Sequence, residues 1–243
     1  MEVYLNRMDG WDDAIISMFL SKRTLTRELE MQIRQEIYKN TNHNPSNGPI
    51  GEFSDTSEQL RNWLSSFFKW CPIHITMGRF LDLSFTVYNI HRAGQDDLDS
   101  HAMRMNNRII RSSTRLADFS NGEMSEYYQG KIIPTDIALA VLGIITPKEI
   151  EYEGKTYVKG VNGYILKGME TNKDVKRGLY MLSIPSTFIF KINLTEFAHM
   201  YKERNNKGTA NPEVKLAVEN MASQIENASC NYINRDLLMK IKN

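Results

Sequence analysis

The spacing of apolar residues changes several times along the chain, and each change predicts a different kind of element. In residues 81–88, Leu, Phe and Val alternate with polar residues or Tyr, a period of two that is typical of a half-buried strand. In residues 60–68, apolar side chains recur instead at helical spacing and would form one broad buried face. The residues of that face are Leu60, Trp63, Leu64, Phe67 and Phe68. Asp55, followed three residues later by Glu58, predicts a capping box at the start of this helix.

Two further helical regions are expected in the first half of the chain. Residues 11–38 are rich in Leu, Met, Glu and Arg, and they are followed by residues 41–55, whose Asn, Pro, Gly and Ser content predicts a loop. After Gly94, a 4-3-4 spacing of apolar residues predicts another helix face. Those apolar residues are Leu98, Ala102, Met105 and Ile109.

The second half of the chain is expected to mix helices and strands. Residues 135–146 are predicted to form a buried helix, with Pro134 and Asp136 at its start. Residues 147–170 are rich in β-branched and aromatic residues with glycines at turns, and they predict a hairpin insertion.

A helix and a strand are predicted next, and Pro185 marks the boundary between them. A helix capped by Asn172 or Asp174 is expected to run through Met181, because Pro185 cannot continue it. Residues 187–194, TFIFKINL, predict a strand.

Two capped helices complete the predicted order. Asn193 and Glu196 predict the start of a helix over 195–204, and Asn211 followed by Pro212 predicts the start of another. Helices and strands in this mixed order predict a single α+β domain over all 243 residues, with a mixed or antiparallel sheet flanked by helices.

Composition narrows the classes of function. The chain has 30 Lys and Arg against 29 Asp and Glu, so its net charge of +1 argues against a general nucleic-acid or membrane-surface binder. The longest apolar run, residues 137–145, is too short to cross a bilayer of roughly 30 Å, and the N-terminus lacks signal-peptide order. Cys71 and Cys230 show no metal or redox spacing. We therefore expect a cytoplasmic protein without a metal site.

The most informative stretch is residues 101–116, HAMRMNNRIIRSSTRL, in which arginines recur at 4-3-4 spacing. On a continuous helix they would place four guanidinium groups on one face. These residues are Arg104, Arg108, Arg111 and Arg115. Such a face needs carboxylate partners or an anionic ligand such as phosphate, which guanidinium groups grip in a bidentate way. The spacing alone leaves both interpretations open.

Two blocks of the chain resemble one enzyme family. In the first block, residues 55–116, the segment 80–87 reads FLDLSFTV, and Ser113, Thr114 and Arg115 follow it. These segments resemble the F-E-H-x-x-F-T-F strand and the end of the R-H-R-x-x-S…S-x-R signature of the flavin-dependent thymidylate synthases.

The second block, residues 174–222, resembles the same family in order and spacing. Arg177 is similar to the Arg of A-R-x-x-L-P, residues 192–193 to the start of V-N-x-R, and Arg204 to an Arg that ends a short helix. The spacing from Arg177 to Arg204 needs no gap. Residues 210–214, ANPEV, are similar to the family's A-Q-x-E-I.

The chain departs from the family at the residues that contact flavin. Where the family has Arg-His-Arg, residues 103–105 read Met-Arg-Met, so Arg104 is the remaining candidate. Thr195 stands in place of the Arg in V-N-x-R, and Arg111 replaces an acidic residue. The nucleotide-binding arginines therefore match better than the flavin-binding ones.

The resemblance implies a fold, a reaction and an assembly. Family members methylate dUMP at C5 to make dTMP, with methylenetetrahydrofolate as the one-carbon donor and FAD, reduced by NADPH, as the hydride donor. They use no enzyme nucleophile, because arginines stabilise the negative charge that develops on the uracil ring. The resemblance also implies a homotetramer with shared active sites.

Residue roles follow from the resemblance alone. Arg204 would be catalytic, because it would polarise the pyrimidine carbonyl. The expected substrate-binding residues are Arg111, Ser113, Thr114, Arg115, Arg177 and Arg204. The expected cofactor-binding residues are Arg104, Asn193 and His199.

Two other functions remain open at this point. The first is a diverged homologue that binds a pyrimidine nucleotide without flavin chemistry, or that modifies another pyrimidine at C5. The second is a nucleic-acid-binding protein that uses residues 104–115, against which the balanced charge argues.

Overall fold

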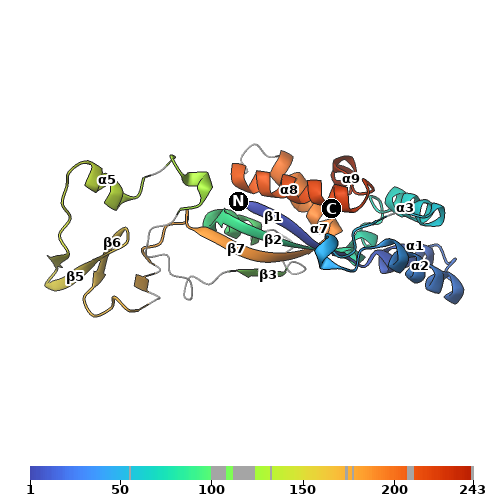
Figure 1. Cartoon of the computed structure of the whole chain (residues 1–243), viewed down its shortest axis with the longest axis horizontal. Coiled ribbons are helices and arrows are strands. Elements are labelled where there is room, and N and C mark those ends of the chain that lie inside the picture. Colours follow the sequence, from blue (N-terminus) through green and yellow to red (C-terminus); the bar gives the residue numbers. More distant parts are fainter. Residues whose placement is uncertain are drawn as a thin grey trace. The chain divides into compact units, whose positions relative to one another are not determined.

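The fold is shown in Figure 1, a computed structural model of the whole chain. The described residues are 1–54, 56–99, 108–111, 124–131, 133–172, 175–176, 178–206 and 211–241, with the backbone alone for 108, 109, 111 and 206. They form two compact units. The first comprises Met1, residues 88–96 and residues 111–188, and the second comprises residues 2–87, 97–110 and 189–243.

Strands and helices are both abundant, which confirms the predicted α+β class. One sheet has four strands in the order β1-β2-β7-β3, and the other has three in the order β4-β5-β6. The four strands of the larger sheet are β1 (Glu2–Asp9), β2 (Asp82–His91), β3 (Arg108–Arg111) and β7 (Pro185–Asn193). The expectation of a single domain stays a prediction.

The predicted period of two in β2 is confirmed, because Leu83, Phe85 and Val87 are fully buried and the residues between them are not. In β7, Phe190 and Ile192 are buried in the same way. These apolar side chains turn one face of the sheet into core, which is the main source of stability for an amphipathic strand.

Strand β1 lies at the edge of the sheet, beside helix α8 (Pro212–Ala228; Figure 1). Gln224 of α8 accepts a hydrogen bond from the Leu5 amide at 2.5 Å and donates one to the Val3 carbonyl at 2.6 Å. These bonds occupy backbone groups that an edge strand would otherwise leave open to another strand.

Three helices follow β1 in the chain: α1 (Trp11–Ser21), α2 (Arg27–Asn40) and α3 (Glu58–Trp70). The expected helical region 11–38 is thus two helices, because Thr26 caps α2 by accepting a hydrogen bond from the Leu29 amide. In the predicted loop at 41–55, the described residues 41–54 contain one short turn of 3-10 helix, η1 (Pro45–Asn47), and otherwise no named helix or strand.

Helix α3 buries the five apolar residues predicted for its core face. The predicted capping box was wrong, since the helix begins at Glu58 and its cap is Ser57. The Ser57 hydroxyl accepts the Leu60 amide proton at 3.1 Å, as a capping side chain does. Asp55 itself lies outside the described residues.

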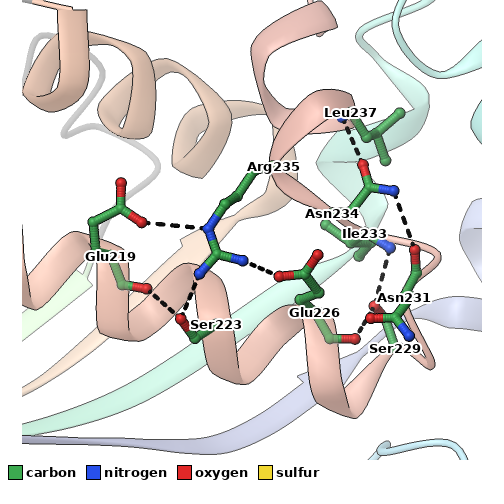
Figure 2. A network of polar contacts seen from close by, with 9 residues as sticks. All are labelled: Glu219, Ser223, Glu226, Ser229, Asn231, Ile233, Asn234, Arg235 and Leu237. Atoms are coloured by element: carbon green, nitrogen blue, oxygen red, sulfur yellow. Dashed lines mark hydrogen bonds and ion pairs between the residues drawn. The ribbon is translucent and has the colours of Figure 1, made fainter.

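Helices α7 (Leu194–Asn206), α8 and α9 (Arg235–Lys240) pack together in the second unit. Figure 2 shows how Arg235 of α9 reaches the side of α8. Its guanidinium donates to Ser223 at 2.6 Å and pairs with Glu219 at 3.4 Å and with Glu226. Asn234 caps α9 by accepting from the Leu237 amide at 2.9 Å.

In the first unit, the predicted hairpin is confirmed as an antiparallel sheet of three strands. They are β4 (Glu149–Tyr152), β5 (Lys155–Gly160) and β6 (Gly163–Leu166). The turn between β4 and β5 places Glu153 and Gly154 at positive φ, which glycine adopts readily.

The predicted buried helix at 135–146 is shorter than expected and is not buried. It is α5 (Thr135–Val141), and none of its residues is buried within one copy of the chain. Val141 is 78% exposed and Ile145 is 92% exposed. The sequence pattern identified the apolar residues of this segment correctly, but it could not show whether the rest of the same chain covers them.

The helix predicted after Gly94 is confirmed as far as Asp99, in α4 (Arg92–Asp99), where Leu98 is buried. Ala102 and Met105 of the predicted face lie outside the described residues. The placement of Ile109 on that helix was wrong, because it lies in β3, where adjacent β-branched isoleucines favour a strand. A continuous arginine face over residues 104–115 is therefore excluded, because Arg108 and Arg111 belong to that strand.

The helix expected to run through Met181 does not reach it. Asn172 accepts from the Val175 amide at 3.2 Å, as a cap would, but Gly178 and Leu179 form a turn. Pro185, which has no backbone N–H, is the first residue of β7, a position at which no N–H is needed for pairing with the neighbouring strand.

Candidate functional site

Three of the residues to which a role was assigned lie along or next to helix α7: Asn193, the last residue of β7, directly precedes it, His199 is in its middle and Arg204 is in its last turn. Asn193 is 6% exposed, and its side-chain oxygen accepts a hydrogen bond from the Glu196 amide at 3.0 Å. The predicted cap is therefore confirmed, and it fixes where α7 leaves β7. His199 is half-buried on the same helix.

Arg204 is held by Asp97, a residue 107 positions away in the chain. Its Nη2 donates to the Asp97 backbone carbonyl at 2.6 Å, and its Nη1 lies 3.5 Å from the Asp97 carboxylate. The Arg204 side chain is 18% exposed and that of Asp97 is 38% exposed. The guanidinium therefore lies largely out of water with its position fixed on one side.

Other polar atoms at the end of α7 are buried and have no partner among the described residues. They are Nε of Arg204 and both Nδ2 and Oδ1 of Asn205. Buried polar groups in native proteins nearly always have a hydrogen-bond partner, so such a group of unpaired atoms is unusual. It marks this helix end as a place where a ligand can bind.

The start of α7 offers less to a cofactor. Thr195, at the position where the family has an Arg, is 2% exposed and donates its hydroxyl proton to the Ile75 carbonyl at 2.7 Å. A Cβ on Gly78 would come within 2.6 Å of the same hydroxyl, so the segment packs directly against Thr195. Asn193 uses its oxygen within the helix.

Most other predicted site residues lie outside the described residues. These are Arg104, Ser113, Thr114, Arg115 and Arg177. The backbone of Arg111 lies in β3, and its side chain is not described. The convergence of these residues with Arg204 on one nucleotide stays a prediction.

Sequence reasoning missed Asp97 and Asn205. The arginine-rich stretch had indicated that carboxylate partners were needed, and the acidic residues 96, 97 and 99 stand immediately before it. That signal could have suggested Asp97 as a partner for an Arg. Asn205 directly follows Arg204 but belongs to no motif, so nothing in the sequence pointed to it.

A second buried polar group lies in the first unit. Ser186 donates to the Gln95 side-chain oxygen, and Arg92 donates to the same oxygen at 3.4 Å. Gln95 Nε2 and the hydroxyls of Ser125 and Ser183 are buried without a partner in the described part of the chain. Ordered water is a common partner of buried serine hydroxyls and amides, and none of these residues was assigned a role from the sequence.

Hollows of about 330 Å³ occur in each unit, away from the end of α7. One lies over β5 and β6 and is lined by Val158, Ile165 and Leu179, and the other is lined by Trp11 and Arg34 among others. Among the described residues, no group of three or more His, Cys, Asp or Glu could hold a metal ion. No helix in these ranges is long and apolar enough to span a membrane.

Comparisons with known proteins support the fold. The sequence matches no protein-family profile and no curated protein. Thymidylate synthase X (ThyX) from Helicobacter pylori, crystallised with FAD and dUMP, superposes with a TM-score of 0.58 at 11% identity, over 98% of this chain and 100% of that one.

A second solved structure differs in its described activity. It is the UMP/dUMP methylase PolB from Streptomyces cacaoi, bound to 5-bromo-dUMP. It superposes with a TM-score of 0.53 at 10% identity and covers 95% of this chain and 92% of that one. At such low identity the comparison establishes the fold alone: the chain has the fold of the flavin-dependent thymidylate synthases.

Proposed function

We propose that the protein binds a pyrimidine deoxynucleotide and methylates it at C5, with dUMP as substrate and dTMP as product. The observation that carries the proposal is the Arg204 guanidinium, which Asp97 holds at the end of α7 while its Nε has no partner among the described residues. The proposal is supported by two neighbours of the same fold whose structures contain dUMP or its 5-bromo analogue.

The chemistry proposed for Arg204 is electrostatic. C5 of the base becomes nucleophilic when negative charge develops on the uracil ring and its carbonyl oxygens, and a fixed donor in a poorly hydrated site stabilises that charge without having to reorganise. Arg204 meets these conditions, because it is mostly buried and its position is fixed by Asp97. Arg111, Ser113, Thr114, Arg115 and Arg177 are proposed to bind the nucleotide.

Methylenetetrahydrofolate is proposed as the one-carbon donor. FAD, when bound and reduced by NADPH, would supply the hydride that completes the methyl group. Arg104 and His199 are the proposed contacts to it, in a cytoplasmic homotetramer with shared sites. Asn193, assigned to the same role from the sequence, would contribute by positioning α7 rather than through its oxygen.

A diverged homologue that binds the nucleotide without flavin is the second candidate. It is favoured by the start of α7, where the side chains of Asn193 and Thr195 are buried and bonded to backbone groups. In that case the nucleotide site would persist and the flavin contacts would not.

Two measurements on the purified full-length protein test the proposal. Calorimetric titration should show binding of dUMP, and Arg204→Ala should weaken that binding by about tenfold or more, since a charge-assisted hydrogen bond is lost. Arg79→Ala, which removes an exposed arginine of η2 (Met77–Phe80), is the matched control and should leave the affinity unchanged. Absence of binding to both dUMP and dCMP would refute the proposed function.

The visible spectrum separates the two candidates. Protein that binds added FAD and oxidises NADPH faster in the presence of dUMP supports the flavin-dependent reaction. Colourless protein that binds dUMP but takes up no FAD supports the diverged homologue.

A further inference from the structure

The unpaired polar atoms at the end of α7 form a specific pattern of donors and acceptors. Nε of Arg204 is a donor, and the amide of Asn205 offers a donor at Nδ2 and an acceptor at Oδ1. All three atoms are buried, and none has a partner in the described ranges. A ligand that satisfies them must offer two acceptors and one donor.

This requirement selects a class of ligand. A phosphate monoester near neutral pH offers mainly acceptors, so it would leave Oδ1 of Asn205 without a donor. The edge of a uracil base offers a carbonyl, an N–H group and a second carbonyl in sequence. That order is complementary to one guanidinium donor and one side-chain amide.

We propose that Asn205 is a specificity-determining residue that reads the carbonyl and N3–H edge of a pyrimidine base, next to the contact from Arg204. This inference rests on the proposed function, which it extends from a nucleotide in general to the recognition of its base. An amide is suited to the task because it makes a bidentate pair with adjacent donor and acceptor atoms of a base.

Asp97 is the positioning residue of this arrangement. It binds Nη1 and Nη2 of Arg204 and leaves Nε, the atom nearest the backbone of α7, without a partner in the part of the chain that the structure describes. Its carboxylate also offsets the guanidinium charge, and a partly neutralised cation favours an uncharged base over a phosphate. The pairing of Arg204 with Asp97 therefore favours a contact between Arg204 and the base, while other residues would bind the phosphate.

Titrations of dUMP and dCMP against the full-length protein test the proposal. Asn205→Asp replaces an amide by a group that only accepts, so it should bind dUMP about tenfold or more weakly, as sites with an unmatched polar group do. It should keep its affinity for dCMP within about threefold, because the amino group of cytosine donates. The ratio of the two affinities would thus shift toward cytosine, which a merely structural defect would not produce.

Asp97→Asn should weaken the binding of both nucleotides, and Asp97→Glu, which keeps the carboxylate, should restore part of it. Asp96→Asn is the matched control for α4, because Asp96 pairs with Arg92 rather than Arg204. Asn162→Asp is the control for Asn205, since Asn162 also carries a buried oxygen with no partner in the described ranges but lies in the β5–β6 turn.

Two negative results have different meanings. If the unmodified protein binds neither nucleotide, the proposed function fails. If it binds dUMP, and Asn205→Asp and Asn205→Ser both bind dUMP and dCMP as the unmodified protein does, the role of Asn205 is wrong and the proposed function stands. Thermal unfolding shows whether the buried carboxylate of Asn205→Asp prevents folding. If it does, Asn205→Ser, which keeps a small polar group, takes its place in the test.

Discussion

At the residue scale, the candidate site combines a residue that the sequence identified with residues that it did not. Arg204 was recognised through its position in a block of matched spacing, a local property of the chain. Asp97 holds it from 107 residues away, and such a pairing becomes visible only when the chain is folded. Asn205 is distinguished by a buried amide that has no partner among the residues described above, which no sequence pattern records.

The two cysteines lead to a prediction at the same scale. Cys71 is buried, and this burial raises the pKa of its thiol to about 12, whereas Cys230 is exposed. Because the thiolate is the reactive form, Cys71 should be almost inert near pH 8. A chromogenic thiol reagent should therefore modify one cysteine per chain in the native protein and two in denaturant.

Cys230→Ser provides the control for this measurement and should abolish the fast reaction. Rapid modification of both thiols in native protein would contradict the burial of Cys71. The same shift has a consequence for stability: the contribution of the buried neutral thiol is complete below the unfolded pKa of 9.0 and is lost as the pH rises toward 12.

At the element scale, the predictions that succeeded rest on local signals. The caps at Asn193 and Asn211 and the alternation in β2 depend on neighbouring residues, and the structure confirms all three. Strand β3 was missed because a helical spacing of arginines coincides with the strand preference of Ile109 and Ile110. Pairing with another strand of the sheet favours the strand over the helix, and a local sequence pattern does not contain such long-range pairing.

The packing of α9 on α8 depends on Arg235, which leads to a prediction about stability. Arg235→Ala removes contacts with Glu219, Ser223 and Glu226, and the side chain is 42% exposed. Solvent screening reduces the effect to about 1–2 kcal/mol, or a fall of roughly 2–8 °C in Tm. Thermal unfolding followed by circular dichroism is the measurement.

A surface pair supplies the comparison. Arg27→Ala removes an ion pair with Glu30 from a side chain that is 73% exposed, and it should lower Tm by no more than about 1–2 °C. Burial and the charge of Glu219 raise the pKa of Tyr201, while Arg235 lowers it. Arg235→Ala should therefore raise the pKa of Tyr201 further in a spectroscopic titration, and an unchanged titration would show that the network is not formed.

At the scale of the whole molecule, the apolar segment 137–145 is largely exposed to solvent in a single copy of the chain. Most of its side chains are aliphatic and none is charged, and α5 buries no residue within one chain. Exposed patches of this kind usually mark contacts with other macromolecules. An uncharged aliphatic surface can pair with an identical copy of itself without charge repulsion, as a twofold interface requires.

We therefore expect this segment to contribute to the proposed homotetramer. Val141→Glu combined with Ile145→Glu would place charges in the interface, where their desolvation opposes association. Sedimentation velocity should show the assembled species for the unmodified protein and smaller species for the double variant. Tyr38→Glu, at an exposed apolar residue of α2, is the control and should leave the assembly unchanged. A double variant that sediments like the unmodified protein would assign the interface to another surface, and dUMP titration of both forms would then show whether the nucleotide site depends on assembly.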